Sequence, residues 1–132
     1  MTVATATTRV LLVEDSAILT KLLTGLIDAE PGVRVVARAD TAAAATDAIA
    51  SEAPDIVVLD LRLREGSGFD VLRALRTADV RPACIVLTNH SSPSYRKAAL
   101  EAGATHFFDK STQIPLMLSV VRSLARSLGS SS

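Results

Sequence analysis

Short apolar runs alternate along the chain with segments of helical periodicity. The five runs begin near residues 9, 33, 55, 83 and 105, with the sequences RVLLV, VRVVA, DIVVL, ACIVL and THFF. Each run is apolar at consecutive positions, which is typical of parallel strands that are covered on both faces. Right-handed crossovers would place the intervening helices on both sides of the sheet. The pattern therefore predicts an α/β domain with a doubly wound, five-stranded parallel sheet flanked by five helices.

Helix-capping residues and apolar stripes mark the helical segments. Residues that favour a helix N-terminus stand at the start of each segment: Ser16, Asp40 or Thr41, Ser67 or Gly68, Ser92 before Pro93, and Ser111 or Thr112. The first helix carries a wide apolar stripe that consists of Ile18, Leu19, Leu22, Leu23, Leu26 and Ile27. We expect one domain over residues 9–128, a flexible N-terminal segment over 1–8 and a frayed C-terminus over 129–132.

The composition is that of an ordinary globular domain. The chain has 132 residues, of which 48% are hydrophobic and 21% charged, and its formal net charge is zero. This balance gives no general attraction to nucleic acid or to an anionic membrane surface. No secretory signal is visible, and no apolar run approaches the roughly 20 residues that span a bilayer. We therefore expect a cytoplasmic protein without direct membrane or nucleic-acid contact, in which the single cysteine, Cys84, is buried and inert.

Polar side chains stand where four of the five apolar runs end. They are Glu14 and Asp15 after the first run, Asp60 after the third, Thr88 at the end of the fourth, and Lys110 after the fifth. The carboxyl ends of parallel strands share one edge of a sheet, and ligands bind at that edge in open α/β folds. We therefore expect three acids, a hydroxyl and an amine to converge there.

The residue types at this edge suit phosphoryl transfer. Carboxylates that lie within a few ångströms of one another raise one another's pKa, and a divalent cation such as Mg²⁺ relieves the repulsion. Asp60, on the central strand, could act as the nucleophile that takes a phosphoryl group and forms an acyl phosphate. Lys110 would neutralise the transferring oxygens, and Thr88 could donate a hydrogen bond to them.

Residues 9–128 resemble the receiver domain of bacterial two-component response regulators. The family has an acidic pair after the first strand, an aspartate ending the third, Ser or Thr ending the fourth and a lysine after the fifth; this chain has Glu14-Asp15, Asp60, Thr88 and Lys110 there. Gly68 and Phe107 occupy the positions of the family's glycine and its switch aromatic. The resemblance implies a flavodoxin-like fold with strand order 2-1-3-4-5.

By this resemblance, Asp60 accepts a phosphoryl group from the phosphohistidine of a histidine kinase or a histidine phosphotransfer protein. Mg²⁺, or Mn²⁺, would be held by Asp15, Asp60, the backbone carbonyl of Arg62, and Glu14 through a water molecule. The chain would then be a signalling domain rather than an enzyme, because it would catalyse only its own phosphorylation and dephosphorylation. No output domain is recognisable in this sequence, so we expect it to act on an unknown downstream protein.

The resemblance also implies how phosphorylation is read out. Thr88 would move toward the phosphoryl group, and Phe107 would occupy the space that Thr88 vacates. This would alter a surface of the fourth helix, fifth strand and fifth helix that binds the downstream protein or forms a homodimer. Arg62 and His90 each lie two residues after a site residue and are candidate modulators of hydrolysis, although His90 could equally be a solvated loop residue.

The sequence departs from the family pattern at three positions. Relatives often have proline four residues after the aspartate, a small residue after the switch hydroxyl and proline after the lysine, where this chain has Arg64, Asn89 and Ser111. None of these changes removes a reacting group, but each alters the expected shape of a loop. A cis bond before a residue other than proline costs roughly 2.5–4 kcal/mol, so we expect the Lys110–Ser111 bond to be trans.

Two other functions remain open at this point. A pseudo-receiver would have the same fold and bind proteins without phosphate, but such chains usually lack one of the acids or the lysine. A small Mg²⁺-dependent phosphatase would share the aspartyl nucleophile. Those phosphatases have a second aspartate two residues after the first, where this chain has Arg62.

Overall fold

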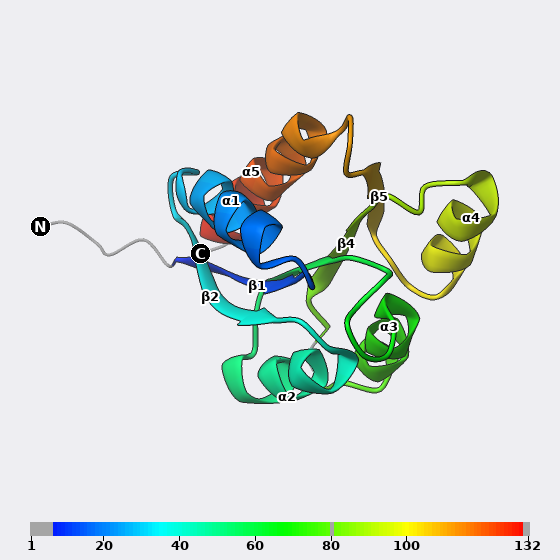
Figure 1. Cartoon of the computed structure of the whole chain (residues 1–132). Coiled ribbons are helices and arrows are strands. Elements are labelled where there is room, and N and C mark those ends of the chain that lie inside the picture. The colour runs from blue at the N-terminus through cyan, green and yellow to red at the C-terminus, as the bar shows by residue number, and fades with distance from the viewer. Residues whose placement is uncertain (1–6, 80, 131–132) are drawn as a thin grey trace, which may run out of the picture.

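The computed structural model describes residues 7–79 and 81–130, and these residues form five strands and five helices. The strands are β1 (Thr8–Val13), β2 (Val33–Ala39), β3 (Ile56–Leu59), β4 (Ala83–Thr88) and β5 (His106–Asp109). All neighbouring strands pair in parallel, in the order β2-β1-β3-β4-β5 (Figure 1). The predicted α/β fold and the predicted strand order are therefore confirmed.

The helices cover both faces of the sheet, and each face has its own apolar core. They are α1 (Ala17–Asp28), α2 (Ala42–Glu52), α3 (Gly68–Arg76), α4 (Pro93–Glu101) and α5 (Ile114–Ser130). α1 and α5 bury residues such as Leu23 and Met117 on one face, whereas α2, α3 and α4 cover the other (Figure 1). Successive side chains of a strand point to opposite faces, so Phe107 and Phe108 of β5 pack in different cores, as predicted.

Four of the five predicted helix starts agree with the structure. The side chains of Ser16, Thr41, Ser67 and Ser92 each accept a hydrogen bond from a backbone N–H in the first turn of α1, α2, α3 and α4. Ser67 also completes a capping box with Asp70, whose carboxylate accepts from the Ser67 N–H at 2.9 Å. Local capping therefore fixes where these helices begin.

The predicted start of α5 is wrong. The helix begins at Ile114 rather than directly after Ser111 or Thr112. The N–H and the hydroxyl of Ser111 both donate to Asp109 Oδ1, at 2.8 and 2.5 Å, so Ser111 closes a turn instead of capping a helix. Gln113 Oε1 accepts from the Asp109 N–H at 2.8 Å just before the helix starts.

The apolar stripe of α1 is only partly buried. Leu23 and Ile27 are 1% and 0% exposed, whereas Ile18 and Leu22 are 81% and 51% exposed. The stripe is wider than the surface that β1, β2 and α5 offer it, so its outer residues face solvent.

Predictions for the cysteine and the chain ends have different outcomes. Cys84 is 2% exposed, and burial raises the pKa of its thiol to about 12, so the predicted buried thiol is confirmed. The predicted flexible segments fall mostly outside the described residues; Thr8 already belongs to β1, and α5 extends to Ser130. Within the described ranges, no helix combines the length and the apolar content required to cross a membrane.

Candidate functional site

The carboxyl ends of β1 and β3 bring three acids together. Glu14 and Asp15 directly follow β1, and Asp60 directly follows β3. Val13 pairs with Leu59, and the Asp60 N–H donates to the Val13 carbonyl at 3.0 Å, so the two chains leave the sheet side by side. One carboxylate oxygen from each of the three acids lies within 4.8 Å of the others. The predicted convergence of these acids is confirmed.

Lys110 enters this cluster from the end of β5. Its backbone N–H donates to the Thr88 carbonyl at 2.9 Å, and its ammonium donates to Glu14 Oε1 at 2.6 Å and to Asp60 Oδ2. The side chains of Lys110, Glu14 and Asp60 are at most 7% exposed. Burial alone lowers the pKa of Lys110, but the hydrogen bonds and charges of Asp60 and Glu14 outweigh it, and the pKa is raised. Lys110 is therefore a protonated cation at neutral pH.

The site contains more negative than positive charge. Burial raises the pKa of Glu14, and the hydrogen bonds from Lys110 and from the Ser16 N–H reduce this effect without cancelling it. The cluster contains three acidic side chains, those of Glu14, Asp15 and Asp60, and one ammonium, that of Lys110. Carboxylate oxygens are the ligands that Mg²⁺ prefers, so this set of donors fits a divalent cation.

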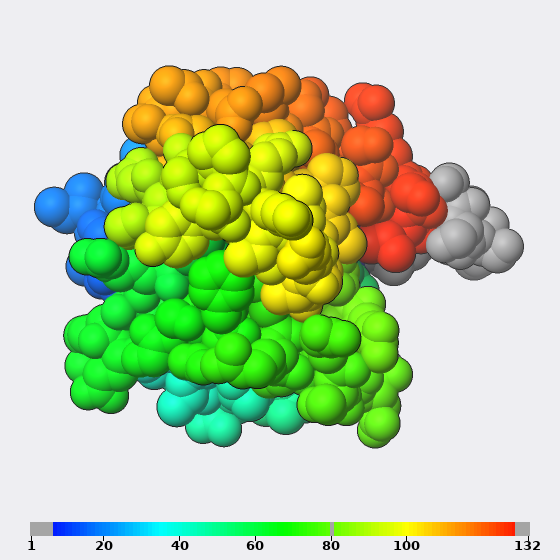
Figure 2. Space-filling view, turned by 90° about the vertical axis from the view of Figure 1, so that its right-hand side faces the viewer, coloured from blue at the N-terminus to red at the C-terminus, as the bar shows by residue number. Residues whose placement is uncertain are grey.

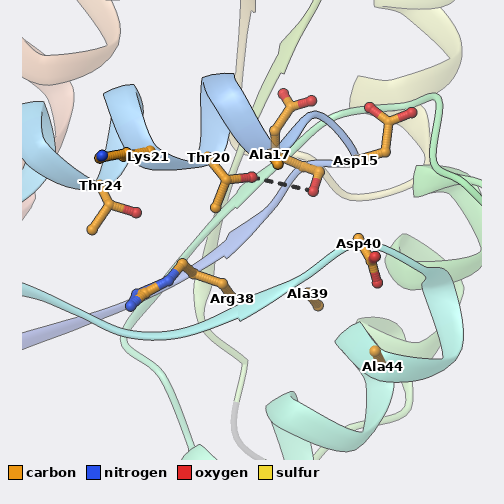
Figure 3. Close-up of a pocket in the computed structure, with 10 residues that line it drawn as sticks. Asp15, Ala17, Thr20, Lys21, Thr24, Arg38, Ala39, Asp40 and Ala44 are labelled. Carbon is orange, nitrogen blue, oxygen red and sulfur yellow. Dashed lines mark hydrogen bonds between the residues drawn. The ribbon is translucent and has the colours of Figure 1, made fainter.

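The acids border a hollow that is open to solvent. Asp15 is exposed, and together with Glu14 it lines a hollow of about 470 Å³ between α1, β2 and α2. Figure 3 shows Asp15 and Asp40 on one side of this hollow and Lys21 and Arg38 on the other. Solvent, and ions in it, can therefore reach Asp15 and Glu14 from this side.

Thr88, Arg62 and His90 lie on the segments that border the cluster. Thr88 is fully buried at the end of β4, and its hydroxyl accepts from the His90 N–H at 3.1 Å. The Arg62 N–H donates to Asp60 Oδ1 at 3.3 Å. Arg62 and His90 line a second hollow of about 320 Å³ beside Tyr95, whose ring lies 5.7 Å from that of His90. His90 is half-buried, so it is packed against the loop rather than fully solvated.

Phe107 lies in the core that α2, α3 and α4 cover. It is 5% exposed. Arg96 of α4 donates from Nη1 to the Phe107 carbonyl at 3.2 Å, and its guanidinium carbon lies 5.7 Å from the ring centroid, within cation–π range. Arg96 could not be identified from the sequence, because an arginine on a helix gives no sign of which strand its side chain will reach.

A second residue that the sequence analysis missed is Asp109. Its carboxylate accepts hydrogen bonds from the hydroxyl of Ser91, in the loop after β4, and from Ser111, in the loop after β5. The sequence showed that Asp109 is adjacent to Lys110, but the bond to Ser91 depends on how the loop after β4 folds.

Gly68 begins α3 where a side chain would not fit. Its N–H donates to the Leu61 carbonyl at 2.8 Å. A Cβ at this position would lie 2.5 Å from the Asp60 carbonyl oxygen and 2.8 Å from Leu61 Cα, closer than non-bonded atoms approach. Glycine therefore allows α3 to start directly against the loop that carries Asp60.

Arg64, Asn89 and Ser111, where the sequence departs from the family pattern, have different surroundings in the structure. Arg64 forms an ion pair with Asp40, with Nε 3.1 Å from Oδ2, which ties the loop after β3 to the start of α2. Asn89 is exposed. No peptide bond among the described residues is cis, so the Lys110–Ser111 bond is trans, as expected.

Comparisons with known proteins agree with this arrangement. Residues 10–122 match the family model of the response regulator receiver domain. The chain is 31% identical over 118 residues to the nitrate/nitrite response regulator protein NarP of Escherichia coli (strain K12), covering 89% of this chain and 55% of NarP. It is 35% identical over 104 residues to the DNA-binding transcriptional activator DevR/DosR of Mycobacterium tuberculosis, covering 77% of this chain and 47% of that protein. A third relative, a protein-glutamate methylesterase/protein-glutamine glutaminase of Treponema denticola, is 32% identical over 104 residues, covering 77% of this chain and 28% of the enzyme.

Solved structures show the same fold. A LuxR-family two-component response regulator from Aurantimonas sp. SI85-9A1 superposes with a TM-score of 0.84 at 30% identity, covering 92% of this chain and 87% of that one. The non-phosphorylated HemR receiver domain from Leptospira biflexa gives 0.77 at 30% identity, covering 89% and 93%. The chain spans 28% to 55% of the length of the three curated relatives named above. These matches and the site geometry show that the chain belongs to the response regulator receiver domain family of two-component systems.

Proposed function

We propose that this receiver domain is a phosphoacceptor in which Asp60 takes a phosphoryl group from the phosphohistidine of a histidine kinase or phosphotransfer protein. The observation that carries the proposal is the buried Lys110 ammonium, which contacts both Asp60 and Glu14. Receiver domains interact with such donors and bind Mg²⁺ at an acidic pocket. The chain then acts as a cytoplasmic signalling domain, without direct contact with nucleic acid or membrane, and not as an enzyme on other substrates.

The proposed transfer uses charges that are already in place. A carboxylate oxygen of Asp60 attacks phosphorus, the bond from phosphorus to the imidazole nitrogen breaks, and its electron pair stays on that nitrogen. Lys110, whose raised pKa keeps it protonated, contributes positive charge beside the acceptor oxygens. When bound, Mg²⁺ or Mn²⁺ supplies further positive charge. The carboxylates of Asp15 and Asp60 and the Arg62 carbonyl would hold it directly, and Glu14 would hold it through a water molecule.

The proposed output runs through Thr88 and Phe107. Phe107 is buried in this structure, and the proposal requires that phosphorylation favour this position once Thr88 has moved toward the phosphoryl group. Arg96 supports the idea because it joins α4 directly to the Phe107 carbonyl. Figure 2 shows α4 between α5 and α3. The surface of α4, β5 and α5, where Tyr95 and Leu100 are 44% and 39% exposed, would bind a downstream protein or a second copy of the chain.

We assign Arg62 and His90 to the lifetime of the acyl phosphate. Both residues line the 320 Å³ hollow, and their backbone N–H groups donate to Asp60 and to Thr88. This proximity supports a role for their side chains in controlling how water approaches a phosphoryl group on Asp60. The relatives named above are a nitrate/nitrite response regulator, a DNA-binding transcriptional activator and a protein-glutamate methylesterase, so different outputs accompany the same kind of domain.

The direct test is incubation with Mg²⁺ and acetyl phosphate, followed by measurement of the intact mass. We expect one phosphoryl adduct that requires Mg²⁺ and is lost in Asp60→Asn. Asp47→Asn, which changes an exposed acid on α2, is the matched control and should form the adduct normally. A folded chain that forms no adduct would instead be a pseudo-receiver. Turnover of added phosphoesters would favour an aspartyl phosphatase.

A further inference from the structure

One carboxylate connects the two loops that flank the phosphorylation site. Asp109 is the last residue of β5 and lies opposite Thr88 of β4 in the sheet register. Its Oδ2 accepts a hydrogen bond from the hydroxyl of Ser91, in the loop after β4. Its Oδ1 accepts from the N–H and the hydroxyl of Ser111, in the loop after β5, at 2.8 and 2.5 Å. Both loops are therefore held by a single side chain.

The backbone of Asp109 also fixes the entry into α5. Its N–H donates to Gln113 Oε1 at 2.8 Å, and its carbonyl accepts from the Gln113 N–H at 2.8 Å. Hydrogen bonds from Ser111 and Ser91 hold the pKa of Asp109 down to about 2, which favours the ionised carboxylate near neutral pH. Asp109 is thus an acceptor at a junction of β5, two loops and α5.

The positions of its partners connect this junction to the chemistry. Ser91 follows Thr88 by three residues and follows His90 directly, and Ser111 follows Lys110 directly. The Lys110 N–H in turn donates to the Thr88 carbonyl at 2.9 Å. A shift of either loop would therefore move the ammonium or the hydroxyl relative to Asp60.

We propose that Asp109 is a positioning residue for phosphoryl transfer, whose bonds to Ser91 and Ser111 hold Thr88 and Lys110 in register with Asp60. Ser111 directly follows Lys110. The Asp109–Ser111 hydrogen bonds restrain the loop here. This inference rests on the proposed function, because it concerns the rate at which Asp60 is phosphorylated.

The test compares the rate of adduct formation from acetyl phosphate and Mg²⁺ in variants of the full chain. Asp109→Asn and Ser91→Ala should each slow the reaction about 3- to 10-fold, since small displacements of aligned groups cost this much or more. The double variant should be no slower than the slower single variant, because both changes remove the same contact. Ser91→Thr retains a hydroxyl and should react at the wild-type rate. Thr112→Ala, which removes a neighbouring exposed hydroxyl, is the matched control.

Two further readouts separate positioning from a general loss of structure. The Mg²⁺ concentration at half-maximal rate should stay unchanged in Ser91→Ala, because the three acids are untouched. The thermal midpoint of Ser91→Ala should fall only slightly below that of Ser91→Thr, since one hydrogen bond is lost and the backbone bonds of Asp109 remain. Wild-type rates in both Ser91→Ala and Asp109→Asn would overturn the positioning role of Asp109 and leave the proposed function intact. Additive losses in the double variant would also overturn it, whereas absence of any wild-type adduct would overturn the proposed function as well.

Discussion

Lys110 is a buried cation shared by two carboxylates, and it therefore differs from a surface lysine in an ion pair. Its ammonium contacts Glu14 and Asp60, and its side chain is 7% exposed. Removing one partner from a buried ion pair leaves uncompensated charge in a poorly solvated place, at a cost of about 3–5 kcal/mol. Stability and the proposed chemistry thus depend on the same ammonium.

Lys110→Met should lower the free energy of unfolding by about 3 kcal/mol near neutral pH without divalent cations. Burial raises the pKa of Glu14, and Lys110 partly offsets this effect. Removing Lys110 should therefore raise the pKa of Glu14 further. An acid with a raised folded-state pKa binds protons more readily when folded, so acidification stabilises the variant relative to wild type. Urea unfolding should therefore show a smaller difference in the free energy of unfolding between wild type and Lys110→Met at pH 5 than at pH 7.

Lys97→Met, at an exposed position on α4, is the matched control and should change the free energy of unfolding little at either pH. If Lys110→Met lowered the free energy of unfolding equally at both pH values, the pKa of Glu14 would not depend on Lys110 as described.

The residues of the acidic cluster could be predicted because each stands next to the end of a strand. Asp60 directly follows β3 and Lys110 directly follows β5, and parallel topology brings such ends together. Arg96 and Asp109 could not be assigned in this way, since their contacts with Phe107 and Ser91 depend on side-chain directions that no run of residues specifies.

At the level of secondary-structure elements, the junction between β3 and α3 fixes the position of the loop that carries Asp60. Gly68 begins α3 against the Asp60 carbonyl, and Ser67 caps the same helix. The loop after β3 is therefore held at both of its ends, by pairing of β3 in the sheet and by the capped start of α3.

Gly68→Ala should destabilise the fold by about 1–3 kcal/mol, because its Cβ meets backbone atoms that cannot move away easily. It should also slow phosphorylation, since relief of the clash displaces the Asp60 loop. Chemical denaturation and the adduct assay measure the two effects.

Gly25→Ala provides the control, because a Cβ there meets nothing within 4 Å and the position lies inside α1. This change should stabilise the protein by about 0.5–1 kcal/mol. A Gly68→Ala protein as stable and as reactive as wild type would show that the loop is more compliant than its contacts indicate.

Helix starts were predictable where the side chain of the capping residue bonds only within the first turn of its own helix. Ser16, Ser67 and Ser92 cap helices as their positions suggested. Ser111 does not, because the carboxylate of Asp109 competes for its N–H and hydroxyl. Sequence periodicity does not reveal such competition.

At the scale of the whole molecule, two cores on opposite faces of one sheet share β5. Phe107 belongs to the core under α2, α3 and α4, and Phe108 packs against the core under α1 and α5. The alternating pattern predicted a parallel sheet with helices on both faces, whereas the strand order followed from the resemblance to receiver domains. It gave no information about the output partner, because a pattern that marks the core does not identify which exposed residues bind a partner.

Hydrogen exchange can test whether the site reaches the α4 surface. Phosphorylation should change the protection of amide protons in α4 and β5 of the wild type, because Arg96 couples α4 to Phe107. Thr88→Ala should form the adduct but leave this protection as in the unmodified chain. Thr46→Ala, on α2, is the control and should behave as wild type. Equal changes in Thr88→Ala and wild type would remove Thr88 from the switch.

Locating the modified residue tests directly whether Asp60 itself carries the phosphoryl group. Borohydride reduction of the phosphorylated chain converts an aspartyl phosphate to homoserine, which peptide mass spectrometry can place in the sequence. We expect homoserine at position 60 and nowhere else. Homoserine at position 15, reduction of Glu14 instead, or a phosphoryl group found on a serine or histidine would contradict it.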